Sequence, residues 1–145
     1  MNEKFHVKEG DIVIDAGVAE GNFSFEIIEK VSKIYMIEAD DNWIEALKLT
    51  FAPFENKIAI IKGFISSYNE GNLITLDSVI HEPVNFIKMD IEGNEWDGLR
   101  GAVKVLQISD DIKLAICAYH SDFDQELIES FLGKHNFEFE SSSGY

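Results

Sequence analysis

"VIDAGVAEGNFS", residues 13–24, opens with four residues that fit a buried strand and continues into glycines and small side chains. Helical periodicity begins directly after this turn, at about Asn22. A glycine-bearing turn between a strand and a helix commonly binds a nucleotide-like cofactor, because its backbone can approach the ligand closely. The turn alone does not identify the cofactor, which depends on residues elsewhere in the chain.

The same order of strand and helix recurs along the chain. Four short apolar runs, "DIVIDAG", "KIYMIEAD", "NFIKMDIEG" and "KLAICAYH", are followed by helical periodicity from about Asn22, Asp41, Asn94 and Asp122, respectively. This alternation predicts an α/β fold with a parallel sheet. The runs at 85–91 and 112–119 are apolar at nearly every position, which favours central strands that helices cover on both faces.

Two further strands complete the predicted sheet. "KIAIIKGFI" at 57–65 is expected to be the third strand, so the first three strands form a βαβαβ half. "FEFES", from about Phe137, is expected to be the last strand. The pattern between 66 and 83 is weak, with one helical turn expected at "TLDSVI". We predict a single domain over residues 1–145, since no linker or repeat divides the chain.

Composition excludes several classes of function. The formal net charge of -15 disfavours nucleic acid and anionic membranes as partners. The only cysteine, Cys117, excludes an intrachain disulfide and fits a reducing compartment. Neither an apolar run long enough for a membrane span nor a signal-peptide core is visible, which predicts a cytoplasmic protein. No Cys/His cluster has the spacing of a zinc site, so no metal is expected.

Acidic residues gather at the predicted carboxyl ends of the strands, where ligands bind in open α/β sheets. Asp15 ends the first strand, Glu38 the second, and Asp90 with Glu92 the fourth. An acid about 20 residues beyond the glycines, as at Glu38, suits a ribose diol. Both NAD enzymes and S-adenosylmethionine enzymes share that feature, so it does not separate them.

Charge separates the two cofactors better. A dinucleotide brings a pyrophosphate, which favours bare N–H groups at a helix N-terminus, whereas this turn carries Glu20 and follows Asp15. S-adenosylmethionine brings a cationic sulfonium and ammonium, which nearby carboxylates favour. The acidic turn therefore points to S-adenosylmethionine. An NAD(P)-dependent oxidoreductase stays the less favoured alternative, since the chain lacks the usual G-x-G-x-x-G and a second domain.

Three stretches, "DIVIDAGVAEGNFS", "TLDSV" and "FIKMDIEGNEWDGLRGA", resemble the FkbM-type methyltransferases. The resemblance covers residues 8 to 135 approximately. It implies a Rossmann-like class I fold, a three-layer sandwich with a mostly parallel sheet, and O-methylation of a hydroxyl on a small molecule or sugar. By position it implies that Asp15, Gly17 and Gly21 form the cofactor loop, that Glu38 binds the ribose, and that Asp90 and Glu92 face the pocket. Glu20, which we also expect at the cofactor, occupies a loop position that is often apolar in this family.

The chain departs from this family pattern in two places. Ala19 replaces the middle glycine of the loop, which puts the cofactor affinity in question. The chain also carries one strand fewer than the seven of the class, so the edge of the fifth strand, "LAICAY", needs another cover. We expect either that the sixth strand moves in beside it or that a second copy forms a homodimer.

Few residues qualify as the base that would take the hydroxyl proton. His120 ends the fifth strand and titrates near neutrality, which makes it the first candidate. Asp90 is the second, and Glu92 is expected to orient the acceptor. A cofactor-binding or assembly protein without turnover stays open as an alternative. Trp43 and Trp96 lie near predicted helix starts, where core contacts are the simpler interpretation.

Overall fold

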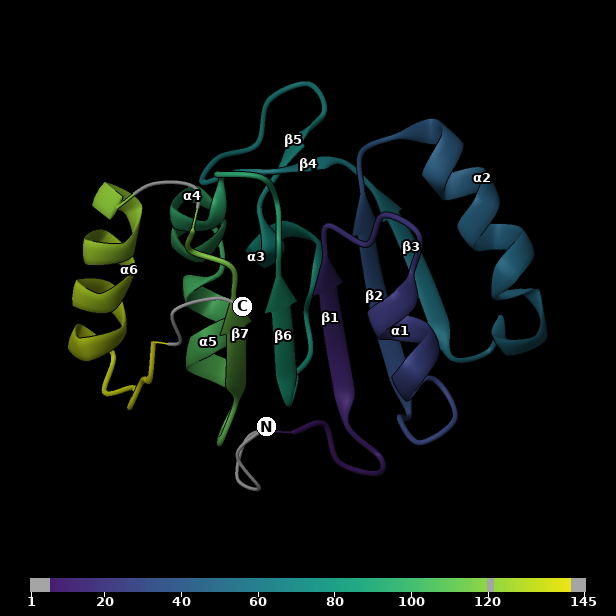
Figure 1. The fold of residues 1–145 in the computed structure, drawn as a ribbon, viewed down its shortest axis with the longest axis horizontal. Helices are drawn as coiled ribbons and strands as arrows, with labels where there is room; N and C mark the ends of the chain where they lie inside the picture. Colours follow the sequence, from purple (N-terminus) through teal and green to yellow (C-terminus); the bar gives the residue numbers. More distant parts are fainter. Residues whose placement is uncertain (1–5, 120–121, 142–145) are drawn as a thin grey trace.

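Five parallel strands form the main sheet of the computed structural model, which describes residues 6–119 and 122–141 (Figure 1). These strands are β1 (Ile12–Ala16), β2 (Lys33–Glu38), β3 (Ile58–Lys62), β6 (Phe86–Met89) and β7 (Lys113–Ile116). Their order is β3-β2-β1-β6-β7. The predicted parallel α/β fold and its βαβαβ half are confirmed.

Helices cover both faces of the sheet and give three layers. They are α1 (Asn22–Ile27), α2 (Asp41–Thr50), η1 (Ala52–Phe54), α3 (Leu76–Val79), α4 (Glu95–Arg100), α5 (Val103–Ile108) and α6 (Asp122–Lys134). α1 and α2 pack on one face, where Ile27 and Leu47 join the strand residues Val13 and Met36 in a buried cluster. The helices α3 to α6 pack on the other face.

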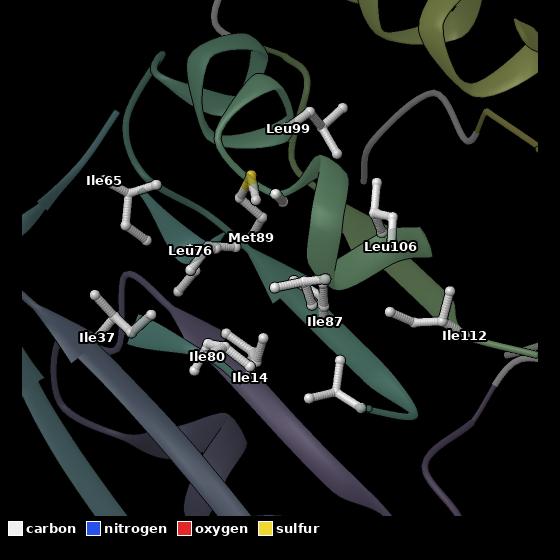
Figure 2. Close-up of a cluster of buried hydrophobic side chains, with 14 of the residues drawn as sticks. Ile14, Ile37, Ile65, Leu76, Ile80, Ile87, Met89, Leu99, Leu106 and Ile112 are labelled. Carbon is white, nitrogen blue, oxygen red and sulfur yellow. The ribbon is translucent and has the colours of Figure 1, made fainter. Parts of the chain in front are cut away.

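The larger cluster of buried side chains lies on that second face (Figure 2). Ile14, Ile37 and Ile87 point there from three neighbouring strands, and Leu76 and Leu99 meet them from the helices. Alternate residues of β1 therefore face opposite layers, since Val13 belongs to the first cluster and Ile14 to the second. This alternation decides which of the predicted site residues can reach the carboxyl edge.

The direction of winding reverses at β1, which pairs with β2 on one side and with β6 on the other. Backbone hydrogen bonds continue past the strand ends: Gly17 N–H donates to the Ile37 oxygen, and Asp90 N–H to the Ala16 oxygen, each over 3.0 Å. The segments after β1, β2 and β6 consequently leave the sheet side by side. In Figure 1 they leave at the upper edge.

The predicted strand over 57–65 is wrong beyond residue 62. Strand β3 ends before Gly63, a residue at which a Cβ atom would lie 2.6 Å from Cδ1 of Ile74. Beyond it, β4 (Phe64–Ile65) pairs with β5 (Leu73–Ile74) in a separate two-stranded sheet. This small sheet lies over the carboxyl edge of the main sheet (Figure 1). The helical turn expected at 75–80 is confirmed as α3.

β6 is a central strand as predicted, but β7 is not. β7 pairs with β6 alone, and among the described residues no strand pairs with its outer edge. All four of its residues are half-buried. An apolar run thus predicted burial against the flanking helices and could not distinguish an internal strand from an edge strand.

Residues 137–141 do not form the predicted sixth strand. The chain closes α6 with a Schellman motif, in which Asn136 has φ 61 and Phe137 N–H donates to the Leu132 oxygen over 2.9 Å. Phe137 then packs against the larger cluster. Closure of the β7 edge by residues 137–141 is therefore wrong, and its cover by a second copy stays a prediction.

Candidate functional site

A cavity of about 630 Å³ opens at the carboxyl edge of the sheet, beside the point where the winding reverses. Its walls come from the segments that follow β1, β2, β3 and β6. The lining residues are Gly17, Ala19, Ile37, Glu38, Ala39, Asp40, Asp41, Asn42, Trp43, Gly63, Phe64, Ile65, Asp90, Ile91, Glu92 and Asn94. Of the predicted site residues, Gly17, Glu38, Asp90 and Glu92 meet here.

The first wall is the β1 loop, which we define as residues 17–21. Gly17 has φ 80, and a Cβ atom there would lie 1.9 Å from the backbone oxygen of Asp90. Glycine is required at this position because the loop passes directly against the end of β6. Gly21 has φ 83 and a buried position against Leu47 and Phe51, so it shapes the start of α1 and does not line the cavity.

Glu38 links the β1 loop to the segment that follows β2. One carboxylate oxygen accepts the Ala19 N–H over 2.8 Å. The other accepts the N–H groups of Ala39 and Asp40 over 2.8 and 3.0 Å. Three backbone donors thus fix the orientation of this carboxylate at the end of β2, and it also lines the cavity. Its lone pairs that remain are available to hydroxyl groups of a ligand.

Asp15 does not reach the cavity, so the structure separates it from the other predicted acids. It is fully buried in the layer that holds α1, where it accepts from Ser24 Oγ over 2.7 Å and from Lys88 Nζ over 3.1 Å. Burial raises the pKa of the Asp15 carboxyl, against the opposing effect of the Lys88 ammonium. The strand alternation explains its position, because Asp15 follows Ile14 and faces the opposite layer.

Lys88 supports the β1 loop from beneath. Its Nζ donates to the backbone oxygen of Gly17 over 3.0 Å as well as to Asp15. The side chain comes from β6 and is 20% exposed. Lys88 therefore has a structural role in β6, where it links the buried Asp15 to the β1 loop.

Glu20 lies on the outside of the β1 loop. Its side chain is exposed, it accepts from Asn22 Nδ2 over 3.1 Å, and it does not line the cavity. Ala19 does line the cavity and adopts φ 48, a left-handed conformation that favours glycine. Ala19 therefore carries a side chain where the family pattern has its middle glycine, in a backbone conformation that glycine adopts more readily.

The second wall is the β6 turn, which we define as residues 90–95. Asp90 and Glu92 both line the cavity, as predicted, and Glu92 has φ 55. Sequence analysis missed Glu95, which is 1% exposed and accepts the N–H groups of Ile91 and Gly93 over 2.9 and 3.1 Å. No capping-box pattern in the sequence indicates this role, because Glu95 is the first residue of α4 and its bonds run back to the turn.

Aromatic side chains at the cavity were also missed. Trp43 of α2 is 41% exposed and Phe64 of β4 is 48% exposed, and both line the cavity. The expected core contact is therefore wrong for Trp43. It holds for Trp96, which packs edge to face on Phe131 with ring centroids 5.7 Å apart. Phe64 could not be predicted because it lay inside an expected continuous strand.

The base predicted at His120 lies outside the described residues. Cys117 is half-buried. Burial raises the pKa of its thiol, and the neighbouring Asp90 carboxylate raises it further. Cys117 is thus a protonated neighbour of Asp90.

The cavity is strongly acidic. Its lining includes Glu38, Asp40, Asp41, Asp90 and Glu92, and none of the lining residues in the described part of the chain is Lys or Arg. Lys62 pairs with Asp41 over 2.6 Å in an exposed contact. Lys88 pairs with the buried Asp15 over 3.1 Å, outside the cavity lining. Such a cavity favours ligands with hydroxyl groups and positive charge over ligands with phosphates.

Within 6–119 and 122–141, no group of three or more His, Cys, Asp or Glu side chains is arranged to hold a metal ion. In the same residues, no helix combines the length and apolar character that crossing a membrane requires.

Comparison with known proteins gives one family match. The model of the methyltransferase FkbM domain matches residues 4–139. No curated protein matches the chain. Among solved structures, the chain is similar to the methyltransferase FkbM from Methylobacillus flagellatus KT, with a TM-score of 0.80 and 23% identity over 89% of this chain and 38% of that one. The chain thus spans well under half the length of that relative.

Two other similar structures have the same fold at lower identity. An rRNA methylase from Streptococcus thermophilus matches with a TM-score of 0.64 and 19% identity, over 87% of this chain and 70% of that one. A protein from Streptococcus mutans, crystallised in complex with SAH, matches with a TM-score of 0.61 and 13% identity, over 88% of this chain and 74% of that one. These likenesses establish the Rossmann-like methyltransferase fold.

Proposed function

The chain belongs to the FkbM methyltransferase family, and from this premise we propose that it binds S-adenosylmethionine in the cavity and methylates a hydroxyl group on a small molecule or sugar. The observation that carries the proposal is Glu38, whose carboxylate is fixed by three backbone N–H groups at the end of β2 and lines the cavity. A carboxylate fixed in this way keeps a lone pair on the oxygen that accepts only the Ala19 N–H, and that lone pair can accept a ribose hydroxyl.

The remaining cavity residues fit the same ligand. The five lining carboxylates suit a cationic amino acid portion and disfavour the pyrophosphate of NAD(P). Trp43 and Phe64 offer apolar surfaces for a purine. S-adenosylmethionine bound there would supply an activated methyl group on a sulfonium.

The chain's own part in transfer is positioning and proton removal. As the new carbon–oxygen bond forms and the carbon–sulfur bond breaks, the hydroxyl proton passes to a base, for which His120 and Asp90 are the candidates, while Glu92 orients the acceptor. Positioning of the two reactants contributes most, up to about 7–11 kcal/mol by effective-molarity arguments. Asp90 and Glu92 lie on the cavity, which supports their part in the proposal.

Calorimetric titration with S-adenosylhomocysteine and, separately, with NAD tests the cofactor. We expect saturable binding of the first and none of the second. The variant Glu38→Gln should weaken binding of S-adenosylhomocysteine about tenfold or more, because a charge-assisted hydrogen bond contributes about 1.5–3 kcal/mol. Glu20→Gln is the matched control, since Glu20 is exposed on the same loop and does not line the cavity. Binding of NAD alone would support the oxidoreductase alternative.

Transfer itself needs a second experiment. Radiolabelled S-adenosylmethionine is incubated with panels of sugars, hydroxylated small molecules, amines and RNA, and each panel is counted for label. We expect label in a hydroxyl-bearing compound and a lower rate in Asp90→Asn, Glu92→Gln and His120→Ala. Cofactor binding without transfer to any panel would instead support a binding or assembly protein.

A further inference from the structure

Glu95 is a buried carboxylate that lies beneath the cavity rather than on it. It is the first residue of α4 and only 1% exposed. Gly98, one turn later, lets α4 approach β6 closely, since a Cβ atom there would lie 2.8 Å from Sδ of Met89 and 3.1 Å from Cδ1 of Ile91. This close packing brings the Glu95 side chain under the β6 turn.

The hydrogen bonds of Glu95 run backward to the turn. Oε1 accepts the Ile91 N–H over 2.9 Å and Oε2 accepts the Gly93 N–H over 3.1 Å. Asp40, at the start of α2, shows the more usual arrangement, because it accepts the N–H groups of Asn42 and Trp43 in its own helix. Glu95 instead joins the residues on the two sides of Glu92.

Glu92 needs such support because of its backbone. Its φ of 55 and the φ of 100 at Gly93 place two consecutive residues in a left-handed region. A residue with a side chain holds this conformation only where its surroundings impose it. The two bonds from Glu95 flank Glu92 and impose it here. They thereby fix the segment that carries Asp90 and Glu92 along the cavity wall.

We propose that Glu95 is a positioning residue, which sets the affinity for the cofactor and the rate of transfer by holding the β6 turn in its cavity-lining conformation. The inference rests on the proposed function, because Asp90 and Glu92 act on a ligand only if the cavity binds one. Glu95 itself touches neither ligand nor reacting atoms, and its effect passes through the backbone of residues 91–93.

Three variants test this role, with S-adenosylhomocysteine as the probe. Glu95→Ala removes both acceptors, Glu95→Gln keeps one oxygen, and Asp97→Asn is the control on the same helix, where Asp97 pairs with Arg100 near the surface. We expect Kd to rise about tenfold in Glu95→Gln and further in Glu95→Ala, with a change of no more than about twofold in Asp97→Asn. Amide exchange at Ile91 and Gly93 should accelerate in the two Glu95 variants.

The outcomes separate the two proposals. If the wild-type chain does not bind S-adenosylhomocysteine, the proposed function fails and the positioning role fails with it. If the wild-type chain binds and a folded Glu95→Gln binds equally well, only the role of Glu95 is overturned. A lower Tm without a change in Kd, or failure of both Glu95 variants to fold, would assign Glu95 to folding and would also overturn the inference.

Discussion

The β1 loop and the β6 turn meet at one cavity, yet they are held in opposite ways. Glu38 and the Ile37 backbone oxygen of β2 accept from the β1 loop, and Lys88 of β6 donates to it, so its support comes from neighbouring strands. The β6 turn depends on Glu95, which lies within the same six residues. The first conformation therefore requires the assembled sheet, whereas the second can be encoded locally.

The largest expected effect comes from Gly17→Ala, which would break the β1 loop where it touches β6. The added Cβ would meet the Asp90 oxygen at 1.9 Å and also face an unfavourable φ of 80. We expect the free energy of unfolding to fall by about 3–5 kcal/mol in urea titrations. Gly10→Ala is the matched control, with φ 82 but open space around it, and should cost only about 1–2 kcal/mol. Equal losses in both variants would contradict the close contact.

A smaller effect is expected from Lys88→Met, which removes the ammonium beneath the β1 loop. Asp15 would stay buried without its cation, and the Gly17 oxygen would lose a donor. Because Lys88 is 20% exposed, we expect a loss of about 2–4 kcal/mol by chemical denaturation, somewhat less than for a fully buried pair. Lys62→Met breaks the exposed pair with Asp41 and should change stability by less than about 1 kcal/mol.

The pH dependence of stability sharpens the same contrast. The folded state raises the pKa of Asp15 above its ordinary value of 3.8, so between these two pKa values the folded state binds more protons than the unfolded state. The contribution of Asp15 to stability is thus greatest below pH 3.8 and is lost as pH rises through the folded pKa. Relative to Asp15→Asn, the wild-type chain should lose stability with rising pH in this window, measured by thermal melts at constant ionic strength. If the wild-type chain instead gained stability relative to Asp15→Asn as the pH rises, the effect of burial on the pKa of Asp15 would be contradicted.

The smallest effect concerns the left-handed residues with side chains in the β1 loop and the β6 turn, Ala19 and Glu92. Ala19→Gly relieves the unfavourable φ of 48 but increases the entropy of the unfolded chain. We therefore expect the free energy of unfolding to rise by only about 0.5 kcal/mol. Glu92→Gly, at φ 55, should give a gain of similar size in the β6 turn. A loss in either variant, measured by urea unfolding, would show that the side chain itself contributes contacts that outweigh the backbone cost.

The sequence predicted those features that depend on local periodicity. It placed β1, β2 and β6, and Glu38 at the end of β2. The prediction that Asp15 belongs to the ligand edge failed in the structure, because neighbouring residues of a strand face opposite layers and the sequence does not say which layer adjoins the cavity.

Two of the errors depend on contacts between different segments, and the third depends on a local helix end. Gly63 ends β3 against Ile74, which an apolar pattern over 57–65 could not indicate. Phe137 closes α6 instead of starting a strand, since Asn136 supports a left-handed helix end. Trp43 lines the cavity together with Phe64 of β4, a strand that is not part of the main sheet. Tertiary packing thus determines the end of β3 and the surroundings of Trp43, whereas the helix end at Asn136 is a local motif.

The central place of β1 also governs the timing of folding. Its partner β2 follows at once in the chain, but β6 pairs with it across a separation of 73 residues, as at Val13 and Phe86. A ribosome that adds about 5–20 residues per second needs about 4–15 s to make that stretch. During this interval one side of β1 has no partner strand from its own chain. The Asp15 carboxylate likewise waits for Lys88, so the nascent chain holds this acid in water until the sheet closes over it.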